Sequence, residues 1–177
     1  MFNFFSEEKY FHSAAVIDEK VPEKPGYYCF RIKNINGLPK RFMLELKNRN
    51  HNILYIGLAS KSLDKRMLKQ ELRSKGHGTF FRSIGAVLGF RPDKGSLQYK
   101  KNKRNYKFND ENKNQIIQWI NDNLIVRWKA VDFIKENEET KLIQNFKPLL
   151  NIAKNPLALT LLSDLRRECV EIANDKS

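Results

Sequence analysis

The most constraining feature of this sequence is a short alternating segment that begins directly after Pro25–Gly26. Along Tyr27–Lys33, the apolar residues that share one side of an extended chain are Tyr28, Phe30 and Ile32. A period of two is typical of a β-strand with one buried face, and a Pro-Gly pair interrupts regular structure. The pattern therefore predicts a strand over this segment, with its apolar side turned toward a core.

Two further strands are predicted to pair with this one. After a turn over Asn34–Lys40, Arg41–Leu46 is predicted as the second strand and Ile53–Gly57 as the third. The polar, asparagine-rich Lys47–Asn52 separates them, as is usual for a loop between strands. We expect the three strands to form an antiparallel meander.

Capping residues and periodicity predict helices beyond these strands. Ser62 is a suitable N-cap for a helix through Arg73, Thr79–Leu88 forms a second helix, and Asn109 or Asp110 begins a third. A β-rich strand over Leu124–Val131 and a helix over Glu136–Phe146, which stops before Pro148, follow. Asn155–Pro156 opens a last helix, which is expected to pack back onto the domain through an apolar stripe of Leu162, Leu165, Cys169 and Ile172.

These elements define the expected fold class as α+β, with a small antiparallel sheet of three or more strands flanked by helices. No internal repeat, low-complexity tract or linker interrupts the sequence. Residues 1–177 are therefore expected to form a single domain, with a core at about 25–151 and a C-terminal helix at about 156–174.

The charge balance points to a polyanionic partner. Lys and Arg number 33 against 20 Asp and Glu, which gives a net charge of +13 and an isoelectric point near 9.8. Nucleic acid is the favoured partner. An anionic membrane is the weaker alternative, because the basic residues are spread along the chain and do not gather on one face of an amphipathic helix.

Two stretches concentrate the cations that we expect to bind nucleic acid. One is the helix after Ser62, and the other is Arg91–Lys107. This second stretch contains seven Lys and Arg residues and a single acidic residue, Asp93, with Tyr99 and Tyr106 interleaved. This second stretch is predicted to be an exposed basic loop, although such a loop could equally serve only to keep the protein soluble. The predicted contacts are Lys65, Lys69, Arg73, Arg82, Lys100, Lys101, Lys103 and Arg104.

Several classes of site and location are disfavoured. Cys29 and Cys169 form no C-x-x-C pair, and the three histidines show no spacing typical of metal ligands. Any bound metal should therefore be held by carboxylate. No stretch has the length of a transmembrane helix, and Met1–Phe11 lacks the pattern of a signal peptide, so a cytoplasmic protein without membrane contact is expected.

Four short segments carry a family resemblance when they are taken in order. They are Pro25-Gly26-Tyr27-Tyr28, Leu54-Tyr55-Ile56-Gly57, Leu63-Asp64-Lys65-Arg66, and the run from Glu139 through Pro148 to Asn151. Together they resemble the GIY-YIG nuclease superfamily over about Pro25 to Asn151. The resemblance implies a metal-dependent endonuclease with DNA as substrate and Mg²⁺ or Mn²⁺ as cofactor.

The resemblance also implies a role for each motif residue. Tyr28 or Tyr55 would position or deprotonate the attacking water, Arg66 would contact the phosphate, and Glu139 would bind the metal. Asn151 would brace the site. The residue types suit the chemistry, because phosphodiester hydrolysis needs cations to stabilise the charge that develops on the phosphate. A tyrosine, whose pKa is about 10 in isolation, would act as a base only beside a cation that lowers this pKa.

Helical geometry singles out Glu139 separately. Leu142, Ile143 and Phe146 define an apolar face, and Glu139 falls near its middle. Two interpretations stay open, a metal-binding carboxylate and a buried ion pair with a lysine or arginine.

Three departures separate this chain from typical members of the superfamily. The long interval from Tyr28 to Tyr55 predicts an extra strand or hairpin, Leu58 stands where a lysine is found in related nucleases, and Gln70 stands where a histidine or tyrosine is common. His77 is a candidate substitute. A nucleic-acid-binding domain that kept the fold and lost turnover is therefore the main alternative. If the chain is active, the absence of a separate recognition domain favours a structure-selective nuclease over a sequence-specific restriction enzyme.

Overall fold

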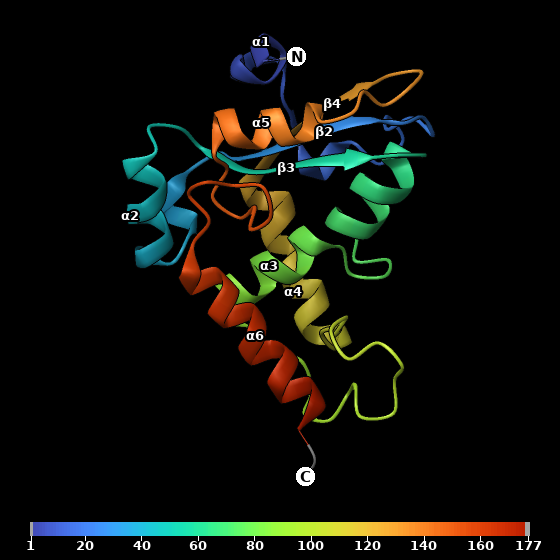
Figure 1. The fold of residues 1–177 in the computed structure, drawn as a ribbon, viewed down its shortest axis with the longest axis vertical. Helices are drawn as coiled ribbons and strands as arrows, with labels where there is room; N and C mark the ends of the chain where they lie inside the picture. The colour runs from blue at the N-terminus through green and yellow to red at the C-terminus, as the bar shows by residue number, and fades with distance from the viewer. Residues whose placement is uncertain (1, 176–177) are drawn as a thin grey trace.

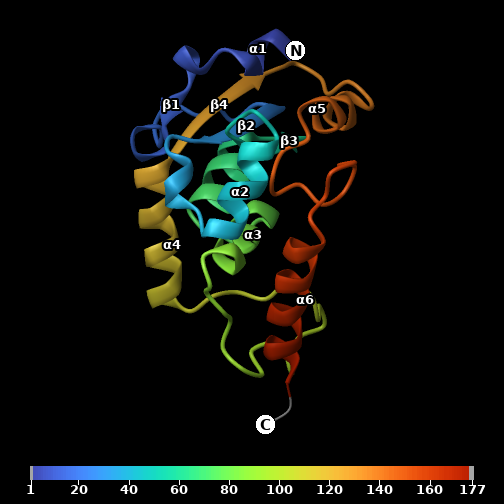
Figure 2. The same cartoon turned by 90° about the vertical axis from the view of Figure 1, so that its left-hand side faces the viewer.

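The computed structural model describes residues 2–175 and contains a four-stranded antiparallel sheet with helices on both faces (Figures 1 and 2). The strands, in spatial order, are β1 (His12–Ser13), β4 (Leu124–Ala130), β2 (Gly26–Ile32) and β3 (Ile53–Ala59). The predicted α+β class is confirmed. Because β2 is paired on both sides, it lies inside the sheet, whereas β3 lies at an edge.

The predicted strand over Arg41–Leu46 is wrong, since this segment lies within helix α2 (Lys40–Asn48). Phe42 and Leu46 are four residues apart and share the buried face of the helix. Most of the helix consists of Lys, Arg, Met, Leu and Glu, which are good helix formers. The expected meander is therefore wrong too: β2 pairs directly with β3, and α2 lies where an extra strand or hairpin was predicted.

The predicted apolar side of β2 faces a core, and the opposite side is buried in a second apolar layer that the alternation did not predict. Tyr28, Phe30 and Ile32 belong to the larger core, on the face covered by α2, α3 (Thr79–Val87) and α4 (Asp110–Asn123). Tyr27 and Cys29 point to the opposite face, which α5 (Glu138–Phe146) covers. Every residue of β2 is buried, so this strand supports both layers.

The helix predicted after Ser62 is present, but it is a π-helix, η4 (Asp64–Leu72). Ser62 Oγ accepts a hydrogen bond from the Lys65 amide at 3.1 Å, which confirms its capping role. The wider winding is visible where the Arg73 amide donates to the Leu68 carbonyl, five residues back. A π-helix is rare and is often found at functional sites.

The remaining predicted helices are confirmed with shifted ends. They are α3 (Thr79–Val87), α4 (Asp110–Asn123), α5 and α6 (Thr160–Asn174). Asn109 caps α4 by accepting a hydrogen bond from the Asn112 amide at 2.9 Å. Helix α6 starts four residues later than Pro156, because the Asn155 side chain is engaged in a turn with Leu157.

The N-terminal segment and the basic loop complete the chain. Before β1, α1 (Phe2–Ser6) and the 3₁₀-helix Glu8–Tyr10 lie above the sheet (Figure 1). Between α3 and α4, the predicted basic loop has neither helix nor strand, and Tyr99 is 91% exposed. The expectation that Tyr106 is displayed beside Tyr99 is wrong, since Tyr106 is fully buried and its hydroxyl donates to the Arg82 carbonyl at 3.3 Å.

One close contact in the sheet leads to a prediction. Gly57 lies opposite Tyr28, and a Cβ atom at position 57 would overlap the Tyr28 ring. Gly57→Ala should therefore destabilise the protein by about 3 kcal/mol, measured by urea unfolding. In a Tyr28→Leu background, where the outer ring atoms are gone, the same change should cost much less. Equal costs in the two backgrounds would contradict this explanation.

Candidate active site

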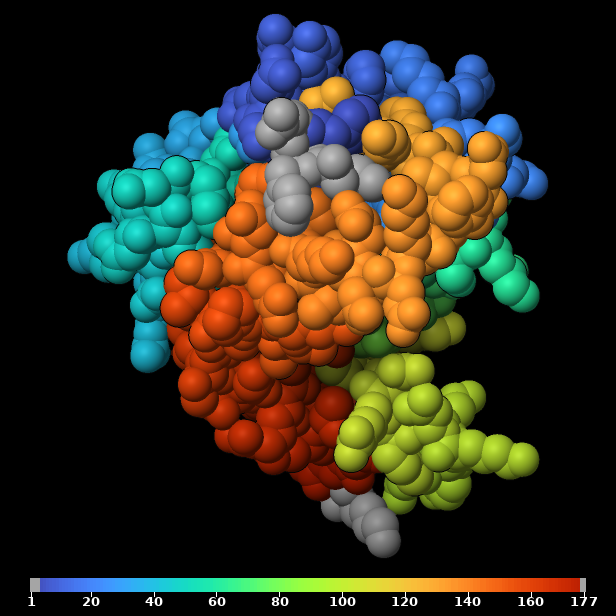
Figure 3. All heavy atoms as spheres, turned by 45° about the horizontal axis from the view of Figure 1, so that its top comes forward, coloured from blue at the N-terminus to red at the C-terminus, as the bar shows by residue number. Residues whose placement is uncertain are grey.

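A cleft of about 510 Å³ opens where β3, α5, α6 and the loop after Pro148 meet. Figure 3 shows α5 and residues 147–157 side by side on one surface, with the basic loop lying beside α6. The polar residues that line the cleft are Tyr55, Thr79, Glu139, Asn151, Lys154, Ser163 and Arg166. Three of the residues singled out by the sequence motifs, Tyr55, Glu139 and Asn151, thus line a single cleft.

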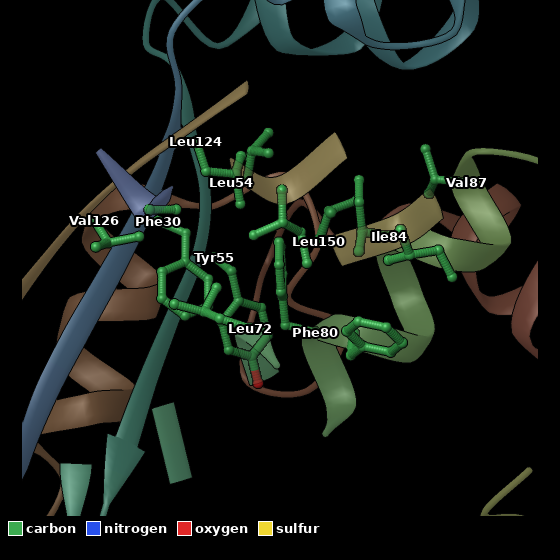
Figure 4. Close-up of a cluster of buried hydrophobic side chains, with 14 of the residues drawn as sticks. Phe30, Leu54, Tyr55, Leu72, Phe80, Ile84, Val87, Leu124, Val126 and Leu150 are labelled. Atoms are coloured by element: carbon green, nitrogen blue, oxygen red, sulfur yellow. The ribbon is translucent and has the colours of Figure 1, made fainter. Parts of the chain in front are cut away.

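Tyr55 lies on β3 at the boundary between the cleft and the larger core. Its side chain is only 7% exposed, and its ring packs beside Phe30 and Phe80 (Figure 4). Tyr28 lies next to it, with the two ring centroids 6.4 Å apart. The Tyr28 hydroxyl is buried and has no hydrogen-bond partner within residues 2–175. The two motif tyrosines therefore form one aromatic pair, of which only Tyr55 reaches the cleft.

Arg66 is held by a buried carboxylate that the motifs do not single out. The guanidinium of Arg66 lies 2.8 Å from Glu71 Oε1 and donates to Gln70 Oε1 at 3.0 Å. The second oxygen of Glu71 accepts hydrogen bonds from the Phe80 and Phe81 amides at the start of α3, at 2.8 and 3.3 Å. Glu71 thus joins η4, which carries Arg66, to α3.

A sequence signal for Glu71 exists in hindsight. It falls on the apolar face that Met67, Leu68 and Leu72 form, where a lone glutamate needs a partner. Gly78 is the second part of the signal, because a Cβ atom there would overlap the Glu71 carboxylate.

The electrostatic environment makes both tyrosines harder to ionise than a tyrosine in water. Burial raises the pKa of Tyr28 well above its usual value and also raises that of Tyr55, and the Glu71 carboxylate adds to both shifts. Arg66 opposes the shifts without cancelling them. Burial also raises the pKa of Glu71, although Arg66 and two backbone amides favour its charged form. For Arg66, burial would lower the pKa, but Glu71 and the tyrosines raise it.

Glu139 lies on α5 with its side chain 22% exposed, and its Oε2 accepts from Lys154 Nζ at 2.9 Å. The ion pair anticipated for this glutamate is therefore present, at the cleft surface. No three His, Cys, Asp or Glu side chains gather as a preformed metal cage anywhere in the described part of the chain. A divalent ion at Glu139 would need water and substrate oxygens as further ligands. This donor set suits Mg²⁺, which keeps several waters and often takes few carboxylates.

Asn151 completes the open edge of the sheet. Its Oδ1 accepts from the Ile56 amide and its Nδ2 donates to the Ile56 carbonyl, both at 2.9 Å. The Leu149 and Leu150 amides donate to the carbonyls of Ile53 and Leu54 in the same way. This segment therefore braces β3 beside Tyr55.

His77 lies outside the cleft. Its side chain is 4% exposed, and its Nε2 accepts from the Phe108 amide at 3.2 Å. It lines a different hollow, together with Lys75, Lys107 and Lys113. The structure does not bring His77 to the motif residues in the cleft.

The cations predicted to bind nucleic acid differ in their availability. Three of the four in and near the π-helix and α3 have other partners, and two of these form ion pairs: Lys69 pairs with Asp64 at 2.5 Å, and Arg73 pairs with Asp18. Arg82 is buried and donates to the His77 carbonyl at 2.5 Å, whereas Lys65 is exposed.

The four predicted cations of the basic loop are all exposed. Lys100 and Lys101 line a surface hollow together with Lys107. Lys103 donates to the backbone carbonyls of Leu97 and Gln98, so it holds the loop as well as adding charge. Arg104, the fourth of these cations, is also exposed.

Comparison with protein families identifies the chain. The family model described as GIY-YIG catalytic domain matches residues 26–168, from the first residue of β2 into α6. The chain belongs to the GIY-YIG family. The matched region includes Tyr28, Tyr55, Arg66, Glu139 and Asn151, and domains of this family are usually endonucleases that act on nucleic acid.

Other comparisons add no relative. Searches of curated proteins and of solved structures return no significant match. None of the helices in residues 2–175 is long and apolar enough to cross a membrane.

The burial of His77 predicts an acid-sensitive stability. Burial, with Lys107 and Arg82 nearby, lowers its pKa to about 4 from an ordinary value of 6.5. The unfolded chain binds a proton at His77 more readily than the folded protein does. The free energy of unfolding is therefore highest above pH 6.5 and decreases by about 3 kcal/mol as the pH falls toward 4. His77→Gln should flatten the pH dependence of urea unfolding in this window. The exposed His12→Gln is the control, and a His77→Gln profile as steep as that of the control would contradict this assignment.

Proposed function

We propose that this GIY-YIG protein is a metal-dependent endonuclease that hydrolyses phosphodiester bonds in DNA, with the cleft as its active centre. The observation that carries the proposal is the meeting of Tyr55, Glu139 and Asn151, which come from separate motifs, in one cleft beside Tyr28 and the Arg66–Glu71 pair. The net charge of +13 favours a polyanionic substrate. DNA is proposed over RNA from the family resemblance.

Glu139 would hold the divalent ion, Mg²⁺ or Mn²⁺, at the cleft surface. When bound, such an ion stabilises negative charge on the phosphate and lowers the pKa of a bound water. Lys154 occupies one oxygen of Glu139 and would have to give way or share the carboxylate. The ion pair is on the surface, and exposed pairs contribute little free energy, so replacing Lys154 by the ion at Glu139 would cost little.

Arg66 and the tyrosines would orient the reacting groups. The fork of Arg66 keeps its charge beside Glu71 and can donate to phosphate oxygens, a geometry that arginine supplies better than lysine. Tyr55 is a neutral phenol at neutral pH, so its hydroxyl can accept a hydrogen bond from the attacking water and donate one to an oxygen. Asn151 keeps the Tyr55 strand in place.

A second candidate function is nucleic-acid binding without turnover. The Lys154–Glu139 ion pair favours it, because the lysine already neutralises the proposed metal ligand. Leu58 and Gln70, which stand where related nucleases carry ionisable residues, favour it too. Incubation of labelled duplex DNA with and without Mg²⁺ or Mn²⁺ separates the two functions, since only the nuclease produces metal-dependent fragments.

Glu139→Gln should abolish metal-dependent cleavage and leave the fold intact, because the amide keeps the volume and removes the anionic ligand. The matched control is Glu138→Gln, one residue earlier on α5 and also partly exposed. Cleavage rates at saturating Mn²⁺ and thermal unfolding test this expectation. Wild-type turnover by Glu139→Gln would remove Glu139 from the site.

The exposed basic loop should contribute to DNA affinity outside the cleft. Replacing Lys100, Lys101 and Arg104 with Ala leaves Lys103 to hold the loop, and should flatten the slope of log affinity against log salt by roughly two to three units. The matched control replaces Lys40, Arg41 and Lys47 on α2, which lies on the other side of the molecule (Figure 1). Equal slopes for the two triple variants would show that the loop only supports solubility.

A further inference from the structure

Arg166 is a cation of the cleft that belongs to none of the four sequence motifs. It lies on α6 and lines the same cleft as Tyr55 and Glu139. Its Nη1 donates to the Thr79 carbonyl at 3.2 Å and to Ser83 Oγ at 2.8 Å. Both acceptors lie on α3, so the guanidinium is pinned between two helices in a defined place.

The charge balance of the cleft sets Arg166 apart from its neighbours. Arg66 is neutralised by Glu71 at 2.8 Å, and Lys154 by Glu139 at 2.9 Å. Within residues 2–175, no carboxylate forms an ion pair with Arg166, although the next residue, Arg167, pairs with Asp164 at 2.7 Å. Arg166 therefore supplies positive charge to the cleft that no protein group neutralises.

The hydrogen-bonding capacity of Arg166 is also incompletely used. Thr79 and Ser83 occupy Nη1 only, and both are neutral acceptors. Nε is buried without a hydrogen-bond partner, and Nη2 has none within the described residues. An arginine that is partly removed from water and lacks an anion is costly, and a phosphate offers both the charge and the oxygens that it lacks.

We propose that Arg166 contacts a substrate phosphate in the cleft and acts there as a second guanidinium beside Arg66. This inference rests on the proposed nuclease function. It assigns the two arginines different tasks: Arg66, whose charge Glu71 already balances, donates to phosphate oxygens beside the tyrosine pair, whereas Arg166 supplies the net positive charge that attracts and holds the phosphate.

The test compares four variants with the wild type on a labelled duplex. Arg166→Ala removes the charge, Arg166→Lys keeps the charge and loses the fork, Ser83→Ala removes a protein contact of Nη1 but keeps the charge, and Arg167→Ala is the matched control on the same helix. Cleavage is followed as kcat and KM with Mn²⁺, and duplex binding is measured by fluorescence anisotropy in EDTA. Thermal unfolding of each variant reports on the docking of α6.

We expect Arg166→Ala to lower kcat/KM by on the order of 100-fold, with a weaker duplex affinity in EDTA. Arg166→Lys should recover part of the affinity, and Ser83→Ala and Arg167→Ala should stay within about threefold of the wild type, the scatter expected for changes outside the contact. If Ser83→Ala lost as much activity as Arg166→Ala, the arginine would be structural and the inference overturned. Equal activity and affinity of Arg166→Ala and Arg167→Ala would overturn it too.

Failure of the proposed function gives a different result. If the wild type does not cleave duplex with any divalent ion tested, the nuclease assignment fails while the binding measurement still stands. A selective loss of duplex affinity in Arg166→Ala would then support the phosphate contact in a binding protein. An affinity equal to that of Arg167→Ala would overturn the contact.

Discussion

The buried Glu71 carboxylate joins two elements of the functional region, η4 and α3. One oxygen pairs with Arg66, and the other accepts the two amides that open α3. These partners stabilise a carboxylate charge that would be costly to bury alone. Loss of the Glu71 side chain would leave Arg66 without an anionic partner and the two α3 amides without their acceptor. Gly78 is required because the carboxylate lies directly against it. The position of Arg66, the start of α3 and the environment of both tyrosines thus depend on one side chain.

The edge of the sheet is the second constraint on the cleft. Strand β3 has no strand partner on its outer side, and residues 149–151 supply the missing hydrogen bonds through two amides and the Asn151 side chain. An unpaired edge would expose backbone groups and let the strand shift. Since Tyr55 precedes Ile56 on this strand, the bracing by Asn151 also determines where the tyrosine meets the cleft.

The charges of the cleft would suit the polyanionic substrate that we propose. Lys154 in the cleft and the nearby Arg66 are each paired with a glutamate, whereas Arg166 in the cleft is not. Burial and Glu71 raise the pKa of both phenols, so neither tyrosine adds negative charge at neutral pH. In the proposed function, a bound divalent ion and a phosphate would change this balance together.

The sequence by itself determined the elements whose signals are local. Period-two alternation located β2, capping residues located η4 and α4, and the order of the motifs identified the family. The strand predicted over Arg41–Leu46 is wrong, because a short apolar segment is compatible with both a strand and a helix until its neighbours decide which face is buried. Only the tertiary structure decided the pairings Lys154–Glu139 and Asn151–Ile56, the burial of Tyr106, and the place of Arg166 in the cleft. The physical reason is distance along the chain: Asn151 and Ile56 are 95 positions apart, and no local pattern records which distant group satisfies a buried charge or amide.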